Sequence, residues 1–222
     1  MTEPTRLAVI VGSTRPGRRA RLVADWVAAC ASRLGHQSDT ALTVEIVDLA
    51  EIDLPMLDEP IPAAIGDYAH EHTKRWAQVV ASYDGFVIVT PEYNHSYPAV
   101  IKNAIDHLFV EWHDKAVGFV TYGLQGGTRA AEHLRLVMAE VKAPCVRSQV
   151  GLGLFTDFTI TDMAEPGELT PGEHQEPTLI RMLGEVVEWA DALAPLRARR
   201  AAAMTTTADP ATDTEAPVEA PA

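Results

Sequence analysis

Five short apolar runs, rich in β-branched side chains, recur along this chain and alternate with stretches of helical periodicity. Such runs are typical of strands buried on both faces, as in parallel sheets covered by helices. Strands that alternate with helices form βαβ units with right-handed crossovers. We therefore predict an α/β fold with a doubly wound, five-stranded parallel sheet. The strands are predicted at 7–11, 42–49, 86–89, 116–121 and 145–150, and the helices at 18–34, 68–83, 98–108, 128–141 and 177–199.

The chain has 222 residues, which is the length of one domain with a substantial core. We assign residues 1–199 to this domain. Residues 200–222 are rich in Ala, Pro, Thr and acidic side chains, and we predict a disordered tail there. The segment 156–176, rich in Asp, Glu, Pro and Gly, is predicted to be a long exposed loop of open function.

Composition excludes several classes of partner. The formal net charge of −13 disfavours nucleic acid and anionic membranes. No apolar run approaches the ~20 residues of a membrane span, and the first residues lack the basic-then-apolar pattern of a signal peptide. Two cysteines are too few for a disulfide framework, so we predict reduced thiols in a cytoplasmic protein. The histidines show no metal-ligand spacing, so no metal is expected.

The loop after the third predicted strand is the most informative stretch. The strand 86–89 ends at Thr90-Pro91, because proline lacks the N–H that a central ladder needs. The residues that follow are Glu92-Tyr93-Asn94-His95-Ser96-Tyr97, and Pro98 suits the first turn of the next helix. Two tyrosines and a histidine stand where a parallel sheet presents its ligands. This pattern indicates a flat aromatic cofactor.

The loop after the first strand favours an anion. It reads Gly12-Ser13-Thr14-Arg15-Pro16-Gly17-Arg18-Arg19 and leads into a helix. Free backbone N–H groups and the helix dipole attract anions at such a junction, and the arginines add forked contacts. The Lys-Ser/Thr pair of a triphosphate loop and the G-x-G-x-x-G dinucleotide fingerprint are both missing. A terminal monophosphate is the better interpretation; a Gly/Pro turn with solvated arginines is the alternative.

With both loops in view, the chain resembles the flavodoxin-like NAD(P)H-dependent FMN reductase family, which includes quinone, azo-dye and chromate reductases. The resemblance rests on Gly12–Arg18, on Pro91–Pro98 with Ile101–Asp106, and on Tyr122–Gly127 with Arg129, in family order over roughly residues 6–150. It implies strand order 2-1-3-4-5, bound FMN, NADPH or NADH as hydride donor, and a homodimer or homotetramer.

The resemblance also implies roles for individual residues. It places the FMN phosphate at Gly12, Ser13, Arg15, Gly17 and Arg18. It places the flavin ring and ribityl chain at Pro91, Glu92, Tyr93 and Asn94, with Tyr122 and Gly123 approaching the ring. No catalytic side chain is implied, because FMN carries the hydride chemistry. Many family members have a serine and an asparagine just after the glycine loop, where this chain has Arg18 and Ala20-Arg21. Phosphate affinity is therefore expected to depend more on charge.

Several of these side chains allow a second interpretation. Glu92 is favoured as a capping or turn-fixing group over a catalytic carboxylate, and His95 as a hydrogen-bonding loop residue over a proton donor. Tyr93 fits a pocket wall and subunit packing equally well.

Three functions are compatible with the sequence. The first is an FMN-dependent oxidoreductase that passes hydride from NAD(P)H through FMN to a small acceptor: a quinone, free flavin, azo compound or metal oxyanion. The alternative is an FMN-binding electron-transfer or redox-sensing protein with little nicotinamide turnover. The aromatic loop favours the enzyme, because an electron shuttle needs only an exposed flavin edge. A phosphate-binding hydrolase on the same sheet is the third. The sequence does not distinguish NADPH from NADH as the hydride donor, and it does not identify the acceptor.

Overall fold

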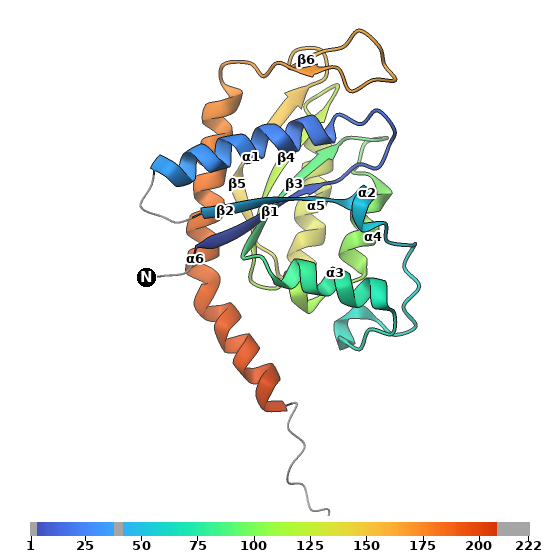
Figure 1. Cartoon of the computed structure of the whole chain (residues 1–222), viewed down its shortest axis with the longest axis vertical. Coiled ribbons are helices and arrows are strands. Elements are labelled where there is room, and N and C mark those ends of the chain that lie inside the picture. The colour runs from blue at the N-terminus through green and yellow to red at the C-terminus, as the bar shows by residue number, and fades with distance from the viewer. Residues whose placement is uncertain (1–3, 38–41, 208–222) are drawn as a thin grey trace, which may run out of the picture.

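A parallel sheet of five strands runs through the centre of the molecule (Figure 1). This computed structural model describes residues 4–37 and 42–207. The strands are β1 (Thr5–Val11), β2 (Leu42–Asp48), β3 (Gly85–Pro91), β4 (Ala116–Gly123) and β5 (Cys145–Gly153). Their order is β2-β1-β3-β4-β5, and every adjacent pair is parallel. The predicted fold class and the strand order implied by the resemblance are both confirmed.

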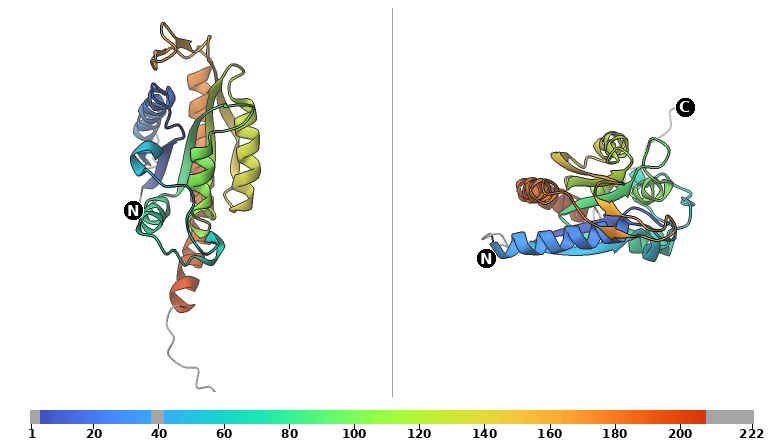
Figure 2. Two further views of the ribbon diagram at one scale, coloured as in Figure 1. Left: turned by 90° about the vertical axis from the view of Figure 1, so that its right-hand side faces the viewer. Right: turned by 90° about the horizontal axis from the view of Figure 1, so that it is seen from above.

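Helices cover both faces of the sheet (Figure 2). On one face lie α1 (Ala20–Gln37) and α6 (Gln175–Thr207); on the other lie α3 (Glu71–Ala81), α4 (Ala99–Asp106) and α5 (Thr128–Glu140). Side chains alternate between the two faces along each strand. In β1, Leu7, Val9 and Val11 pack with α1 and α6, whereas Ala8 and Ile10 pack in the core beneath α3 and α4. Burial on both faces explains why the strand sequences are almost wholly apolar.

The third strand continues to Pro91, beyond the predicted end at Val89. Its pairing with β1 stops at Val89, opposite Val11, so the proline lies where only β4 is a neighbour. The missing N–H therefore breaks no ladder hydrogen bond to β1. The amide of the next residue, Glu92, then donates to the Tyr122 carbonyl oxygen at 2.9 Å. The strand and the loop after it are thus held against β4.

The last helix is longer than predicted, because it continues to Thr207 rather than ending at Arg199. Arg200, in this extension, pairs with Asp114 at 2.6 Å, and Arg197, just before it, pairs with Asp84 at 2.8 Å. The first residues assigned to the tail are therefore helical, and 208–222 lie outside the described residues. None of the helices that the structure describes is long and apolar enough to cross a membrane.

Short elements that the sequence did not predict connect the main ones. They are α2 (Leu49–Ile52), the 3₁₀ turns η1 (Ala63–Ile65) and η2 (Val110–Trp112), and a small hairpin of β6 (Phe158–Thr159) and β7 (Glu168–Leu169). The hairpin lies within the predicted long loop 156–176. Four connections meet at the carboxyl edge of the sheet: those after β1, β3, β4 and β5. Ligands bind at this edge of a doubly wound sheet, where the strand order reverses.

Candidate functional site

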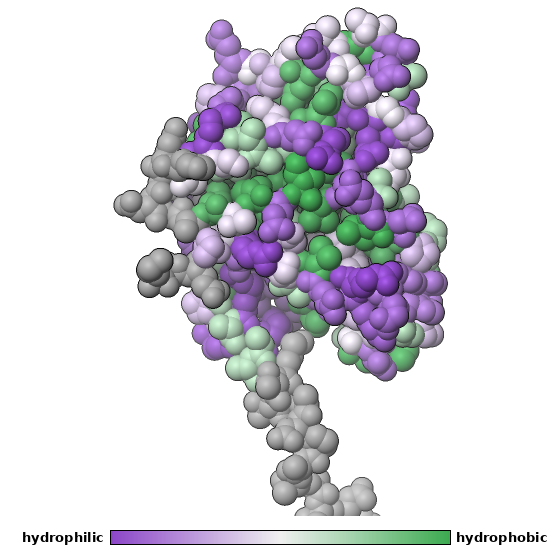
Figure 3. Space-filling model, in the orientation of Figure 1, coloured by the Kyte–Doolittle hydropathy of each residue, from purple (hydrophilic) through white to green (hydrophobic). Residues whose placement is uncertain are grey.

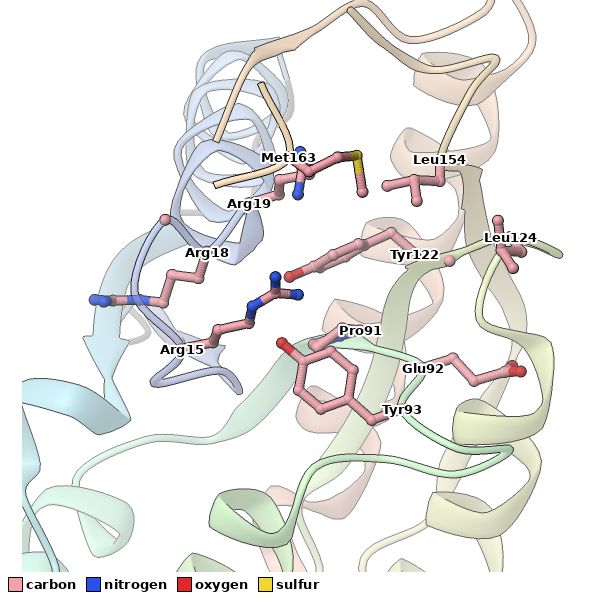
Figure 4. A pocket seen from close by; sticks show the side chains of 12 residues that line it. Arg15, Arg18, Arg19, Pro91, Glu92, Tyr93, Tyr122, Leu124, Leu154 and Met163 are labelled. Atoms are coloured by element: carbon pink, nitrogen blue, oxygen red, sulfur yellow. The ribbon is translucent and has the colours of Figure 1, made fainter. Parts of the chain in front are cut away.

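A cavity of about 190 Å³ opens where the connections after β1, β3, β4 and β5 meet (Figure 4). Eight of the eleven predicted site residues line it: Arg15, Gly17, Arg18, Pro91, Glu92, Tyr93, Tyr122 and Gly123. The other three, Gly12, Ser13 and Asn94, belong to the same loops but are not part of the lining. Four further lining residues were not predicted: Arg19, Leu124, Leu154 and Met163. The structure thus brings three separate sequence motifs to one place.

The loop after β1 packs tightly against its neighbours. The Gly12 amide donates to the Val89 carbonyl oxygen at 2.8 Å. A Cβ on Gly12 would lie 2.4 Å from Ile101 Cδ1, so only glycine fits between β3 and α4. Next to it, the Ser13 hydroxyl is buried and lies 3.2 Å from the Tyr93 hydroxyl. This hydrogen bond joins the first loop to the loop after β3.

The three arginines of the first loop have different environments. The Arg15 guanidinium lies between the hydroxyl ends of Tyr93 and Tyr122, whereas Arg18 points away from them (Figure 4). Arg18 Nη2 donates to Asp48 Oδ2 at 2.6 Å, and the Asp48 side chain is only 1% exposed. The same carboxylate caps α2 by accepting from the Ala50 amide. The Arg18 charge is therefore already paired with a protein carboxylate, although its buried Nε atom has no hydrogen-bond partner among the described residues.

Arg19 has no such partner. It is 6% exposed, and its Nε and Nη2 atoms have no hydrogen-bond partner among the described residues. A buried guanidinium without an acceptor destabilises the fold, because it has lost its hydrogen bonds to water and has formed none with the protein in their place. Its place in the cavity lining therefore indicates that the cavity takes an anion. The sequence contained this residue within the motif, but no local pattern distinguishes it from Arg18.

The loop after β3 is shaped by a tight turn. Asn94 and His95 both have positive φ angles, 48° and 73°, and the Tyr93 and Ser96 backbones exchange two hydrogen bonds across them. Asparagine and histidine tolerate this left-handed geometry better than most residues. The side chain of Ser96 also contacts His133 Nδ1 at 2.9 Å. The turn thus holds Tyr93 at the edge of the cavity.

Glu92 fixes this loop to the start of α5. Its carboxylate accepts from Arg129 Nη1 at 2.6 Å and from the Arg129 amide at 3.1 Å. Arg129 also donates to Gln125 Oε1 at 2.8 Å. These contacts belong to a positioning group, which is the interpretation that the sequence favoured for Glu92. The carboxylate links the connection after β3 to that after β4.

The connection after β4 brings backbone close to the cavity. A Cβ on Gly127, whose φ is 69°, would lie 2.8 Å from both Thr121 Cβ and the Tyr122 amide nitrogen. The Tyr122 ring is buried against Phe158, with ring centroids 5.8 Å apart. Burial, together with the neighbouring Tyr93, raises the pKa of Tyr122 well above its ordinary value. Tyr122 therefore remains a neutral hydrogen-bonding group.

A second cluster of polar side chains lies elsewhere. Ligand atoms of Asp58, His72 and His107 lie within 4.8 Å of one another, because the loop before α3 brings Asp58 to the two histidines. However, both ring nitrogens of His107 already have protein partners, at 3.2 Å from Thr73 Oγ1 and 3.2 Å from the Pro55 carbonyl oxygen. The prediction that the protein needs no metal therefore stays our proposal.

Comparison with known proteins decides the family. The sequence profile of the NADPH-dependent FMN reductase family matches residues 5–157. The chain belongs to this family. Its five-stranded parallel sheet, in the order 2-1-3-4-5 and flanked by helices, is flavodoxin-like. The protein is accordingly an NAD(P)H-dependent oxidoreductase whose cofactor is FMN.

Several relatives carry matching names. An NAD(P)H-dependent FMN reductase of Schizosaccharomyces pombe is 39% identical over 163 residues, which cover 72% of this chain and 79% of the relative. One from Saccharomyces cerevisiae is 37% identical over 191 residues, covering 82% and 97%. A quinone reductase of Pseudomonas putida is 32% identical over 154 residues, covering 66% and 76%.

Solved structures support the fold. An oxidoreductase from Corynebacterium diphtheriae superposes with a TM-score of 0.66 at 17% identity, covering 86% of this chain and 99% of that one. A flavoenzyme NAD(P)H:(acceptor) oxidoreductase from Paracoccus denitrificans gives 0.61 at 23%, covering 85% and 98%. At these identities the likeness establishes the architecture alone.

The side chains present suit FMN. Arg15 and the unpartnered Arg19 supply the cations that a phosphate monoester needs. Tyr93 and Tyr122 supply aromatic surface next to these arginines, and Gly123 brings the backbone of the connection after β4 to the same cavity. The orphaned nitrogens of Arg19 are the observation that favours an anionic cofactor over a neutral one.

Proposed function

We propose that the protein transfers hydride from NAD(P)H through FMN to a flat, quinone-type acceptor. The single observation that carries the cofactor's placement is the buried Arg19, whose free Nε and Nη2 atoms call for an anion at the first loop. The phosphate then lies at Arg15 and Arg19, and the ring lies toward Pro91–Asn94 and Tyr122–Gly123. The relative named quinone reductase supports a planar acceptor.

The protein's part in the reaction is binding and orientation, since FMN itself supplies the hydride chemistry when bound. Arg15 and Arg19 neutralise the phosphate, and the pairing of Arg18 with Asp48 holds the backbone of the same loop in place. Glu92 and Arg129 keep the loop after β3 from moving away from β4. Leu124, Leu154 and Met163 supply apolar side chains to the remaining wall of the cavity. No side chain is assigned an acid or base role.

Rapid mixing tests this proposal. Protein reconstituted with FMN is mixed with NADPH, and separately with NADH, in the absence of oxygen, and flavin absorbance is followed. We expect bleaching within seconds with at least one donor, and reoxidation on adding a quinone. Turnover with quinones, free FMN, azo dyes and chromate at a fixed NADPH concentration then ranks the acceptors. Flavin that stays oxidised with both donors would refute the enzyme and favour a passive electron-transfer protein.

We further propose that the protein is a homodimer. Four apolar side chains on the loop before α3 face solvent, namely Met56, Leu57, Ile61 and Ile65. Hydrophobic atoms are visible at lower right in Figure 3, where this loop lies in Figure 1. The loop is not free: Asn103 Oδ1 accepts from the Leu57 amide at 2.9 Å, and Asn103 Nδ2 donates to the Pro55 carbonyl oxygen at 2.7 Å. A fixed apolar surface favours association.

Light scattering coupled to size-exclusion chromatography measures the assembly directly. We expect the mass of a dimer for the unmodified chain and of a monomer for Ile65→Asp, because a charge at a 70% exposed position disfavours only a buried interface. Leu136→Asp, at an equally exposed site on α5, is the control and should leave the mass unchanged. A monomeric unmodified protein would contradict the proposal. The free thiols of Cys30 and Cys145 support the further proposal of a cytoplasmic location.

A further inference from the structure

The segment between β5 and α6, residues 154–174, forms the upper wall of the cofactor cavity. Leu154 and Met163 both come from it and lie on the opposite side of the cavity from Pro91 and Tyr93 (Figure 4). We call this segment the cover. The family profile ends at residue 157, so nearly the whole cover lies outside the part of the chain that defines the family. Its role therefore has to be derived from its own contacts.

One carboxylate fastens both ends of the cover. Asp157 is 3% exposed, and its Oδ2 accepts from the Gly153 amide at 2.8 Å and from Thr156 Oγ1 at 3.0 Å. Its Oδ1 accepts from the Gly172 amide at 2.9 Å. Burial alone would raise the pKa of Asp157, but these hydrogen bonds lower it below its ordinary value. The side chain therefore stays ionised. The two ends of the segment therefore cannot separate without breaking this clasp.

Near its start, the cover packs against a residue that lines the cavity. Phe158, in β6, is buried and packs against the ring of Tyr122, which itself lines the cavity. The short hairpin pairs Phe158 with Leu169 and Thr159 with Glu168. The hairpin and its packing on Tyr122 therefore hold the cover in place over the cofactor cavity.

The tip of the cover touches the phosphate loop. Asp162 shapes the tip, because its Oδ1 accepts from the Ala164 amide at 2.8 Å and its carbonyl oxygen accepts from the Glu165 amide. A Cβ on Gly17 would lie 1.8 Å from the Ala164 carbonyl oxygen, so the two backbones meet where a side chain has no room. Met163, next to Ala164, then faces the cavity, although it is 54% exposed overall.

We propose that the cover closes the phosphate end of the cofactor site, so that FMN leaves only when the tip lifts from Gly17. Met163 and Asp157 act as positioning residues that set the residence time of the cofactor: Met163 by its contact in the cavity, Asp157 by holding the cover down. This inference rests on the proposed placement of FMN.

The test measures the rate at which FMN leaves. Protein loaded with FMN is diluted into excess apoflavodoxin-type scavenger, and the change in flavin fluorescence is followed. We expect Met163→Ala to release FMN about fivefold faster and Asp157→Asn more than tenfold faster than the unmodified protein. Because Met163 is half exposed, its variant should keep the melting temperature of the apoprotein within about 1 °C. A merely structural role would shift that temperature instead.

Phe155→Ala is the matched control. Phe155 belongs to the same segment and is apolar and 70% exposed, but it does not line the cavity. Its variant should release FMN within twofold of the unmodified rate. If Asp157→Asn fails to fold by circular dichroism, Met163→Ala decides the question alone. Release from Met163→Ala at the unmodified rate overturns the cover but leaves the proposed function intact. An unmodified protein that takes up no FMN overturns both.

Discussion

Replacing Arg19 with methionine should move stability and cofactor affinity in opposite directions. Methionine keeps an unbranched apolar stem and removes the buried cation. Two nitrogens of Arg19 have no acceptor in the folded chain, and each buried unsatisfied donor costs ~1–3 kcal/mol. We expect the apoprotein to gain about 2 kcal/mol in free energy of unfolding. For a chain of this size that corresponds to a rise of roughly 4–8 °C in melting temperature.

The affinity for FMN should fall in the same variant. Hydrogen bonds between charged groups contribute ~1.5–3 kcal/mol, and a loss of about 2.8 kcal/mol corresponds to ~100-fold weaker binding. Urea unfolding of the apoprotein, followed by tryptophan fluorescence, gives the stability. Titration with FMN gives the dissociation constant.

Arg18→Met is the matched control one residue away. It removes the partner of Asp48 at 2.6 Å and leaves a buried carboxylate with only the Ala50 amide. Breaking a buried ion pair costs ~3–5 kcal/mol. Because the Arg18 side chain is 24% exposed, we expect a loss of about 2 kcal/mol. The reasoning fails if Arg19→Met destabilises the apoprotein as Arg18→Met does, or if it binds FMN within threefold of the unmodified chain.

Three further changes probe separate features of the fold and the site. Gly12→Ala should lose about 2 kcal/mol of stability in urea, because its Cβ would lie 2.4 Å from Ile101 Cδ1; an unchanged midpoint would contradict the tight packing. Glu92→Gln should weaken FMN binding severalfold with under about 1 kcal/mol of stability lost, since Arg129 is 37% exposed; equal affinity in a titration would exclude the positioning role. Burial opposes ionisation of Glu59, but hydrogen bonds from Thr73 and the Ala69 and His70 amides lower its pKa to about 2. The ionised Glu59 therefore stabilises the fold above pH ~4.3, and this stabilisation is lost as the pH falls from there to about 2. When unfolding is measured at successive pH values, the free energy of unfolding of the unmodified protein should fall by about 1–2 kcal/mol more than that of Glu59→Gln over this window.

The sequence was most informative where the determinants are local. Strands buried on both faces give continuous apolar runs, so the sheet could be predicted without knowledge of its neighbours. Turn chemistry is also local, and the loops after β1 and β3 were found in this way, whereas the loop after β4 was assigned to the site through the resemblance. The strand order came from the resemblance, because periodicity does not report which strands pair.

Non-local contacts explain what the sequence did not reveal. Arg18 and Arg19 are equivalent in sequence, and only Asp48, at the end of another strand, decides which of them stays free for a ligand. Met163 reaches the cavity because Asp157 and Gly17 hold its segment there, and no pattern around residue 163 encodes those contacts. The extension of α6 is held in the same way by Asp114, which lies far from it in the chain.

The hydrogen bond between Ser13 and Tyr93 couples the loop after β1 to the loop after β3. A phosphate oxygen that accepts the Ser13 hydroxyl hydrogen competes with the Tyr93 hydroxyl for it, so occupation of one loop changes the freedom of the aromatic ring on the other. Linkage requires the converse: a molecule that draws Tyr93 away from Ser13 alters the affinity of the phosphate end by the same factor. For an acceptor that binds against Tyr93, this linkage would make its affinity depend on whether the phosphate end is occupied, and the affinity of the phosphate end would depend equally on the acceptor.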